Sequence, residues 1–513
     1  MARSPNVVVI VADQLRADAV GAFGAERART PHLDALAADG MTFTNAFVQH
    51  PVCSPSRASF LTSWYPHTAG HRTLDALLRP EEPNFLRTFR DQGYRVVWAG
   101  DRGDTFAPGA TELSADEHGF TRPPAGSHWG GEPYERGRRR PEITGVGADD
   151  PLWDRLFYGG EVLDDAVGFD EAAVRTAESW LSDAHEQPWL LFVPLLAPHC
   201  PFEVPQPWFS LYDRAAQPAP VPPPSGNAPA YLSAIRDKHG LARATPEIWQ
   251  EVAAVYHGMV SRLDDHVGRV RAAVAATGAA EDTVFAFFSD HGEYLGDFGV
   301  IEKWPSAMHA CVTRDPLILS GGPVPAGRTS DALVELVDVF PTLLDLAGIR
   351  ATHSHYGRSL RPLFDDPDAE HRAYAFTEGG FLAEEEPRME RGAFPYDLKG
   401  ELQHENPRLA GKAFAARDRD WTYVWRLYEG PELYDRRADP DETRNLSGSP
   451  RHAAVEDRMR TAILSWLAAT TDVLPPNRDP RRPAVNLPAP GQAGSPRSAP
   501  RTSASLRTSS QAG

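Results

Sequence analysis

The chain has 513 residues, 41% of them hydrophobic, and its 70 acidic residues against 52 lysines and arginines give a formal net charge of −18. This charge argues against a general binder of nucleic acid or anionic membranes, whereas an acidic protein can still bind an anionic substrate if cations gather in one pocket. Three cysteines do not make a disulfide framework, and no apolar run approaches the length of a membrane-spanning helix. We therefore expect a cytoplasmic protein with one large domain and a smaller one, or with two to three ordinary domains.

The first predicted strand covers residues 7–11, a short and continuous β-branched run that is typical of a buried parallel strand. Asp13 and Gln14 follow it almost at once, so a carboxylate and an amide lie at the carboxyl end of the strand, where ligands gather in open α/β sheets. Taken alone, Asp13 is better explained as a cap of the following turn. A helix starting at residues 30–36 and a strand over 41–47 come next.

The segment Cys53-Ser54-Pro55-Ser56-Arg57 passes from a small, polar stretch into a predicted helix. Ser54 suits the helix cap, and Pro55 suits the first turn. Cys53 is thereby placed at a helix N-terminus, where free amide groups and the helix dipole favour an anion, and Arg57 can project toward the same anion. An isolated cysteine here would ordinarily be a buried residue beside a helix start.

Strand and helix patterns alternate through the middle of the chain. The predicted strands cover 94–98, 189–196, 283–289 and 316–319, and the predicted helices cover 84–92, 171–182, 246–275 and 339–347. The longest helix carries apolar residues at three- and four-residue steps, which indicates core packing and no chemistry by itself. Residues 101–161 break the pattern, and their basic cluster at 136–140 is usually a solvated loop, although it could rim a cleft for an anionic substrate.

This alternation predicts an α/β fold with a large, mostly parallel sheet sandwiched by helices. From about residue 361 it weakens, and strands at 373–377 and 421–426 with a closing helix at 452–468 indicate a smaller C-terminal α+β domain. The Pro-, Ser-, Arg- and Ala-rich end is predicted to be disordered. We therefore divide the chain into a large α/β domain at 1–360, the smaller domain at 361–472 and a tail at 473–513.

Polar side chains follow four predicted elements: Asp13 with Gln14, Cys53 with Arg57, His199, and Asp290 with His291. Each of these residues alone could have a purely structural role, as the cap of a turn or as a half-buried, hydrogen-bonded histidine. Because the carboxyl ends of parallel strands converge in space, their shared position instead indicates one common site. Lys303 completes the set, although a solvated loop lysine is the commoner fate of this residue type. Carboxylates hold a divalent cation, while Arg, Lys and His side chains bind a tetrahedral oxyanion.

Read in order, these segments resemble the formylglycine-dependent type I sulfatases of the alkaline-phosphatase superfamily. The string from Cys53 to Arg57 is similar to that family's C-x-P-x-R signature. The likeness runs over residues 6–446 and rests on the segments 6–14, 53–57, 198–202, 263–268, 289–293 and 432–446. Together and in this order the motifs are highly specific, and they span nearly all of the folded part.

The resemblance implies a modified nucleophile and a metal ion. Cys53, oxidised by a formylglycine-generating enzyme during maturation, would become formylglycine, and its hydrate would attack sulfur and later expel sulfate. One divalent metal ion would lower the pKa of this nucleophile and neutralise substrate charge. Its ligands would be Asp13, Asp290 and His291, with Gln14 as a further candidate.

The resemblance also implies roles for the cationic residues. Arg57 and Lys303 would stabilise charge on the transferring group. His199 would protonate the leaving oxygen or donate a hydrogen bond to sulfate. The implied substrate is a small-molecule sulfate ester.

Two features depart from the family pattern. Many relatives carry Gly-Lys-x-His where this chain has Gly100-Asp101-Arg102-Gly103, and although Arg102 can replace the charge, nothing obvious replaces the histidine. A His ligand beside Asp13 and Gln14 replaces an all-oxygen set and resembles choline-sulfatase-like and phosphonate-monoester-hydrolase-like relatives. The expected metal is Ca²⁺, with Mn²⁺ as the alternative because imidazole suits softer ions.

Three functions are therefore weighed. Hydrolysis of sulfate esters leads, and hydrolysis of phosphonate or phosphate esters in the same site is the alternative, since both substrates present a tetrahedral oxyanion. The missing Lys-x-His pair motivates a third hypothesis, a non-catalytic relative that binds metal or sulfate. The sequence does not name the alcohol or phenol part of a substrate, and it leaves the oligomeric state open, with a homo-oligomer as one option.

Overall fold

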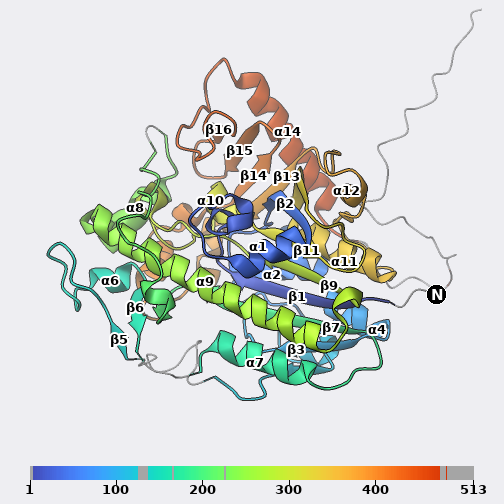
Figure 1. Ribbon diagram of the computed structural model, residues 1–513. Coiled ribbons are helices and arrows are strands. Elements are labelled where there is room, and N and C mark those ends of the chain that lie inside the picture. The colour runs from blue at the N-terminus through green and yellow to red at the C-terminus, as the bar shows by residue number, and fades with distance from the viewer. Residues whose placement is uncertain (1–3, 125–136, 164–166, 225–226, 474–480, 482–513) are drawn as a thin grey trace, which may run out of the picture.

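The computed structural model describes residues 4–124, 137–163, 167–224, 227–473 and 481. Nine strands of these residues form a central sheet in the order β10-β2-β11-β9-β1-β7-β3-β4, with β12 pairing with β2 (Figure 1). The strands are β1 (Asn6–Asp13), β2 (Gly40–Phe47), β3 (Arg95–Ala99), β4 (Glu117–Gly119), β7 (Trp189–Pro198), β9 (Thr283–Ser289), β10 (Arg314–Asp315), β11 (Leu317–Ser320) and β12 (Arg328–Glu335).

The strands at the centre of the sheet run parallel. β1 pairs in parallel with β7 and with β9, so that Val9 lies opposite Phe192 on one side and Ala286 on the other. β11 is different, because it runs antiparallel to both β9 and β2. The predicted, mostly parallel sheet is thus confirmed, while the direction of β11 had no signal in its short apolar sequence.

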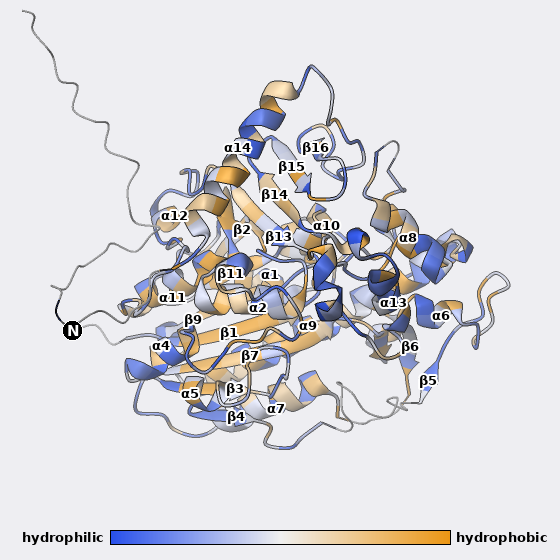
Figure 2. Ribbon diagram, turned by 180° about the vertical axis from the view of Figure 1, so that it is seen from behind, coloured by the Kyte–Doolittle hydropathy of each residue, from blue (hydrophilic) through white to orange (hydrophobic). Residues whose placement is uncertain are grey.

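Helices cover both faces of the sheet because successive β1 residues point to opposite sides. Val8 and Ile10 pack in one hydrophobic cluster with α1 (Pro31–Ala38), α7 (Phe169–Leu181) and α9 (Pro246–Ala276). Val7 and Val9 pack in a second cluster with α2 (Cys53–Thr62), α4 (Phe85–Asp91) and α11 (Val339–Ala347). Figure 2 shows β1 and β7 as almost continuously hydrophobic, as buried parallel strands require.

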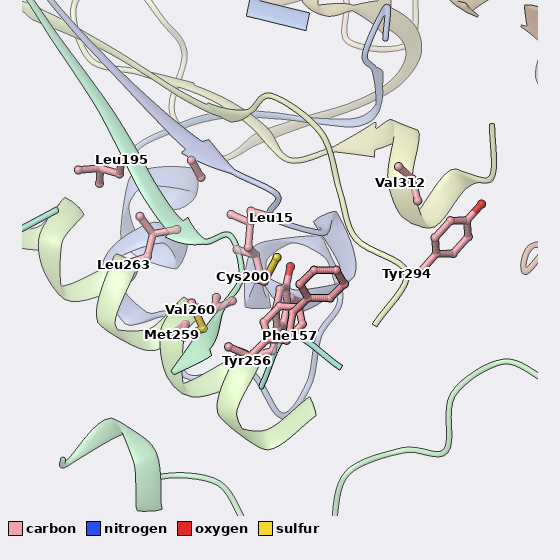
Figure 3. Close-up of a cluster of buried hydrophobic side chains, with 14 of the residues drawn as sticks. Leu15, Phe157, Leu195, Cys200, Tyr256, Met259, Val260, Leu263, Tyr294 and Val312 are labelled. Atoms are coloured by element: carbon pink, nitrogen blue, oxygen red, sulfur yellow. The ribbon is translucent and has the colours of Figure 1, made fainter. Parts of the chain in front are cut away.

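The longest helix, α9, supplies much of the first cluster. Its apolar stripe is buried as predicted, and it consists of Ile248, Val252, Val255, Met259, Leu263, Val267 and Val270. Figure 3 shows Leu263, Met259 and Tyr256 of α9 in the same cluster of buried side chains as Leu15, which lies two residues after the end of β1. This packing fixes the carboxyl end of β1, and with it the position of Asp13.

A separate four-stranded antiparallel sheet follows in the chain, in the order β13-β14-β15-β16. It consists of β13 (Ala375–Gly379), β14 (Ala413–Arg417), β15 (Trp421–Arg426) and β16 (Glu432–Asp435), and α14 (Ala453–Thr470) packs against it. The predicted α/β fold with a large sheet flanked by helices and a smaller α+β part is therefore confirmed. Between β13 and β14 the chain forms α13 (Asp397–Glu405). The proposed domain boundaries at 360 and 472 stay predictions, and the tail from 474 lies outside the described residues apart from residue 481.

The segment after residue 100 contains more structure than its composition predicted. It supplies β5 (Arg138–Arg139) and β6 (Tyr158–Val162), which form a small sheet with β8 (Phe202–Pro205). Arg138, Arg139 and Arg140 of the basic cluster each pair with an acidic side chain, so their charge is neutralised locally. Residue 136 of that cluster lies outside the described residues.

The remaining helices are short connectors. They are α3 (Pro66–Ala69), α5 (Thr111–Ser114), α6 (Leu152–Arg155), α8 (Ala230–His239), α10 (Ala310–Thr313) and α12 (Pro362–Asp365). In the part of the chain that is described, no helix has both the length and the apolar composition needed to cross a membrane.

Candidate active site

The carboxyl ends of β1 and β9 meet the N-terminus of α2. Asp13 is the last residue of β1, Asp290 and His291 follow β9 directly, and Cys53 is the first residue of α2. All four side chains are buried, and one ligand atom of each lies within 4.8 Å of the others. The structure thus brings together the nucleophile candidate and three of the four predicted metal ligands.

The first turn of α2 is held by backbone and side-chain contacts. The N-cap residue of α2 is Val52, whose apolar side chain cannot cap the helix, and the Ser54 hydroxyl instead donates to the Leu74 carbonyl at 3.3 Å. The predicted cap by Ser54 is therefore wrong, because Ser54 already lies inside the helix. The Ser56 hydroxyl donates to the Asp290 carbonyl at 2.6 Å, which ties α2 to the end of β9.

Cys53 lies among acceptors. Its sulfur is 3.2 Å from His291 Nε2 and 3.7 Å from Asp13 Oδ1. Burial raises the pKa of the Cys53 thiol well above its ordinary value, and the Asp13 carboxylate raises it further, while Lys303 offsets part of this effect. The anion-favouring helix N-terminus expected from the sequence is thus outweighed by desolvation and by neighbouring carboxylates.

The geometry of His291 fits a cation site. A carbonyl can only accept a hydrogen bond, so the 2.9 Å contact from His291 Nδ1 to the Gly292 carbonyl places the proton on Nδ1. Burial lowers the pKa of His291, so the imidazole is neutral and presents the Nε2 lone pair inward. That atom lies 3.6 Å from Asp13 Oδ1 and 3.7 Å from Asp290 Oδ1. These three atoms each present a lone pair to the same space, so together they can bind a divalent metal ion. The hydrogen bond from His291 Nδ1 to a backbone carbonyl holds the imidazole in the orientation typical of histidine ligands.

The two carboxyl groups have opposite pKa shifts. Burial alone would raise the pKa of Asp13, but nearby cations, Arg102 and Arg57 among them, hold it well below its usual range. Burial and the neighbouring Asp13 charge raise the pKa of Asp290. The arginines of the chain therefore stabilise the charged form of Asp13, but they offset the rise in the pKa of Asp290 only in part. A bound metal cation would favour ionisation of both carboxyl groups.

Two guanidinium groups contact these carboxylates. Arg57 Nη2 lies 2.8 Å from Asp290 Oδ2 and 3.2 Å from Asp13 Oδ2. Arg102 Nη2 lies 2.7 Å from Asp13 Oδ2 and 2.6 Å from Asp104 Oδ2. Asp104 Oδ2 is also 3.5 Å from Arg57 Nε, so this carboxylate holds both arginines. Arg102 does enter the site, as its charge suggested, and Asp104 is a site residue that the sequence reasoning missed.

Lys303 links the remaining predicted residues. Its Nζ lies 3.0 Å from His199 Nε2 and donates to Gln14 Oε1 at 2.8 Å. His199 Nδ1 contacts the Cys200 carbonyl at 2.6 Å, so Nδ1 carries the proton and Nε2 accepts from Lys303. Burial, followed by the Lys303 charge, lowers the pKa of His199 to about 3. His199 is therefore a neutral acceptor.

Gln14 occupies a strained position at the centre of this arrangement. Its φ of 69° is left-handed, and its backbone N–H donates to Asp290 Oδ1 at 3.2 Å. Its side-chain nitrogen donates to Glu293 and its side-chain oxygen accepts from Lys303. The amide oxygen is thus bound to an ammonium group here, and a role for Gln14 as a metal ligand stays a prediction.

Comparisons with known proteins agree with this geometry. A family model described as Sulfatase matches residues 5–349. Iduronate 2-sulfatase of Mus musculus is 30% identical over 394 residues, which cover 67% of this chain and 69% of the relative. A multifunctional alkaline phosphatase superfamily protein of Trinickia caryophylli is 28% identical over 521 residues, with 91% of this chain and 96% of the relative covered. The solved phosphonate monoester hydrolase of Agrobacterium radiobacter superposes with a TM-score of 0.70 at 25% identity, covering 91% of this chain and 96% of that one.

Proposed function

The chain belongs to the sulfatase family, and on that premise we propose that it hydrolyses sulfate esters with residue 53, in its formylglycine form, as the nucleophile. The observation that carries this proposal is the position of Cys53, whose sulfur lies 3.2 Å from His291 Nε2 and 3.7 Å from Asp13 Oδ1. Arg57 of the same helix, and Arg102 and Lys303 from two other segments, bring positive charge to the same edge of the sheet. The reacting atom would thus sit between a metal-binding set and oxyanion-binding side chains.

The electrostatics around Cys53 support modification rather than direct thiolate chemistry. A thiol attacks as its thiolate, and catalytic cysteines have lowered pKa values. Here burial and Asp13 raise the pKa of the thiol. An aldehyde hydrate at residue 53 does not depend on a thiolate, and it would supply one hydroxyl to attack sulfur and a second whose proton loss expels sulfate. The maturation partner of this proposal is a formylglycine-generating enzyme.

Asp13, Asp290 and His291 would hold the metal, with Gln14 as a further ligand if its amide oxygen is released from Lys303. A divalent cation bound there supplies Lewis-acid chemistry and counter-charge beside residue 53. We propose Ca²⁺ for the two carboxylates and the amide, with Mn²⁺ as the alternative because of the imidazole.

The chain's own cations would bind the transferring group. Arg57 Nη1 is buried without a hydrogen-bond partner among the described residues, which leaves a donor for a substrate oxygen. Arg102 orients Asp13 and adds positive charge at the same edge. His199 Nε2 accepts a hydrogen bond from Lys303 Nζ. The proton offered to a leaving oxygen would therefore reside on Lys303 Nζ, and His199 would hold this ammonium group in position.

Phosphonate or phosphate ester hydrolysis remains the second candidate. It is favoured by the likeness to the phosphonate monoester hydrolase, which extends over 91% of this chain. Both groups present a tetrahedral oxyanion to the same cations. Turnover of matched aryl sulfate, phosphonate monoester and phosphodiester substrates would separate the two, and a strong preference for phosphorus esters would overturn sulfate ester hydrolysis as the main activity.

The first experiment is mass spectrometry of the tryptic peptide 30–57, which contains Cys53 as its single cysteine, from protein made in its own host. We expect an aldehyde in place of the thiol, together with turnover that Cys53→Ala abolishes. Cys311→Ala is the matched control and should keep its turnover. An unmodified thiol and no turnover, with a modifying enzyme present, would favour the non-catalytic relative instead.

A further inference from the structure

Glu302 bridges two ammonium groups at the edge of the site. Its Oε1 lies 2.6 Å from Lys303 Nζ, and its Oε2 lies 2.7 Å from Lys399 Nζ. Lys399 belongs to α13, far along the chain and outside the residues matched by the family model. One carboxylate thus joins the lysine that contacts His199 to a lysine from the C-terminal part of the chain.

These charges are removed from water and fixed in place. Glu302, Lys303 and Lys399 are 2%, 5% and 6% exposed. Glu302 has a left-handed φ of 65°, and its backbone N–H donates to Glu293 Oε1 at 2.6 Å, so its backbone is held in place while the two lysines hold its carboxylate. Buried ion pairs of this kind are sensitive to the loss of one partner, because the other charge is left uncompensated.

A second carboxylate, that of Glu390, also holds Lys399, and Gln403 holds Glu390 in turn. Lys399 Nζ lies 3.1 Å from Glu390 Oε2, and Gln403 Nε2 donates to the same oxygen at 3.0 Å. The same segment reaches the neighbourhood of His199, because the Tyr396 hydroxyl donates to the Cys200 carbonyl at 3.3 Å. That carbonyl is the one that accepts from His199 Nδ1. Residues 390–403 therefore contact Lys303 through Glu302, and they contact His199 through the Cys200 carbonyl.

We propose that Lys399 is a positioning residue for oxyanion binding, acting on Lys303 through Glu302. This inference rests on the proposed function, in which Lys303 is one of the cations that bind the transferring group and offers its proton to the leaving oxygen. With Lys399 present, the Glu302 charge is shared between two cations, so Lys303 keeps positive potential toward the pocket. Without Lys399, both oxygens of Glu302 are available to Lys303, which lowers that potential and draws Nζ away from His199 and Gln14.

The test is binding of inorganic sulfate to the full-length, metal-loaded protein by calorimetry, in a Cys53→Ala background so that modification plays no part. Lys399→Met should raise the sulfate Kd roughly tenfold, the order expected for a unit charge one bridging residue away. Lys399→Arg should restore most of the affinity. Lys238→Met is the matched control, since Lys238 of α8 pairs at the surface with Glu401 and Glu405 of α13, the helix that carries Lys399. The sulfate Kd of this variant should not change.

A double-mutant cycle separates positioning from a general effect on folding. If Lys399 acts through Glu302, Lys399→Met should change the sulfate Kd by less than about twofold in a Glu302→Gln background. The double variant also removes both buried charges, so it tests the inference where the single variant fails to fold. A full Lys399 effect in that background, or an unchanged Kd in folded Lys399→Met, overturns the inference.

Steady-state kinetics distinguish this inference from the proposed reaction. In the unmutated Cys53 background, Lys399→Met should raise KM, and raise the inhibition constant of inorganic sulfate, more than it lowers kcat. Turnover by the wild type with no Lys399 effect overturns the positioning role alone. Sulfate binding that depends on Lys399, in a protein that never turns over a sulfate ester, overturns the proposed reaction alone.

Discussion

Arg102 Nη2 lies 2.7 Å from Asp13 Oδ2, so a guanidinium from the loop after β3 contacts a carboxylate at the end of β1. Arg102 is fully buried, and a second nitrogen donates to the Leu195 carbonyl at 3.1 Å. The sequence suggested that Arg102 could replace the charge of the missing Lys-x-His pair. The structure places Arg102, with Asp104 two residues on, against the site.

Arg102→Met should lower kcat/KM by about 10²- to 10³-fold, the usual cost of one preorganised charge donor. Arg102→Lys should recover only part of this loss, because an ammonium group cannot reproduce the fork that contacts Asp13, Asp104 and the Leu195 carbonyl. The control is Arg95→Met, which removes a half-exposed ion pair between Arg95 of β3 and Glu117 of β4. Steady-state kinetics check the prediction, and an unchanged kcat/KM in Arg102→Met would contradict it.

Removal of the metal should abolish turnover without unfolding the protein. We expect chelation to lower activity by at least about 100-fold, because the proposed reaction depends on the Lewis-acid stabilisation that the cation supplies. The fold should persist because Arg57 and Arg102 partly neutralise Asp13 and Asp290 on their own. Far-UV circular dichroism before and after chelation, and reloading with Ca²⁺ or Mn²⁺, measure both effects. Full turnover in protein shown to be metal-free would refute the proposed site.

Asp264 of α9 caps α1 from a distance, accepting from the backbone N–H groups of Leu33 at 2.7 Å and His32 at 3.1 Å. Asp264→Ala should therefore lower the free energy of unfolding by about 1–2 kcal/mol, as for other lost helix caps. Asp265→Ala, at the next position of α9, is the control and should have a smaller effect. Denaturant unfolding measures the difference, and equal losses in both variants would contradict a capping role.

The pKa of Asp264 predicts that the free energy of unfolding depends on pH. Burial raises the pKa of Asp264 to about 6, and the two backbone hydrogen bonds offset this only in part. The folded state then binds more protons than the unfolded state between pH 4 and 6, so the Asp264 contribution to stability falls as pH rises through that range and is constant above it. Unfolding free energies of wild type and Asp264→Asn from pH 4 to 7 check the sign. A difference between them that does not vary with pH would show that the pKa is not raised.

A buried ion pair joins the region after β12 to the region before β13. Asp338 accepts from Arg372 Nε at 2.8 Å, and Arg372 Nη1 lies 3.0 Å from Glu335 Oε2. Asp338→Ala would leave the buried Arg372 short of one carboxylate and should cost about 3–5 kcal/mol. Thermal denaturation measures this loss. The exposed pair of Arg361 and Asp345 is the control, and Asp345→Ala should cost less than about 1 kcal/mol.

The sequence by itself determined the class of the fold and the core of the site. The β-branched run of β1 and the apolar stripe of α9 specify period and burial, which are local properties, and both are as predicted. Because parallel strand ends share one edge, the positions of Asp13 and Asp290 in the sequence were enough to expect them together. The short motif from Cys53 to Arg57 indicated the nucleophile, through its resemblance to the formylglycine signature of sulfatases.

Only the tertiary structure decided which charges face each other. Nothing near Lys399 or Glu302 in the sequence indicates that they pair, and nothing near Asp104 indicates that its carboxylate contacts Arg57. The anion-favouring helix N-terminus at Cys53 was a sound local inference, yet carboxylates from other segments and burial reversed its effect on the thiol. Propensity and periodicity act over a few residues, whereas electrostatics and desolvation act through space, and so depend on packing between segments that are distant in the chain.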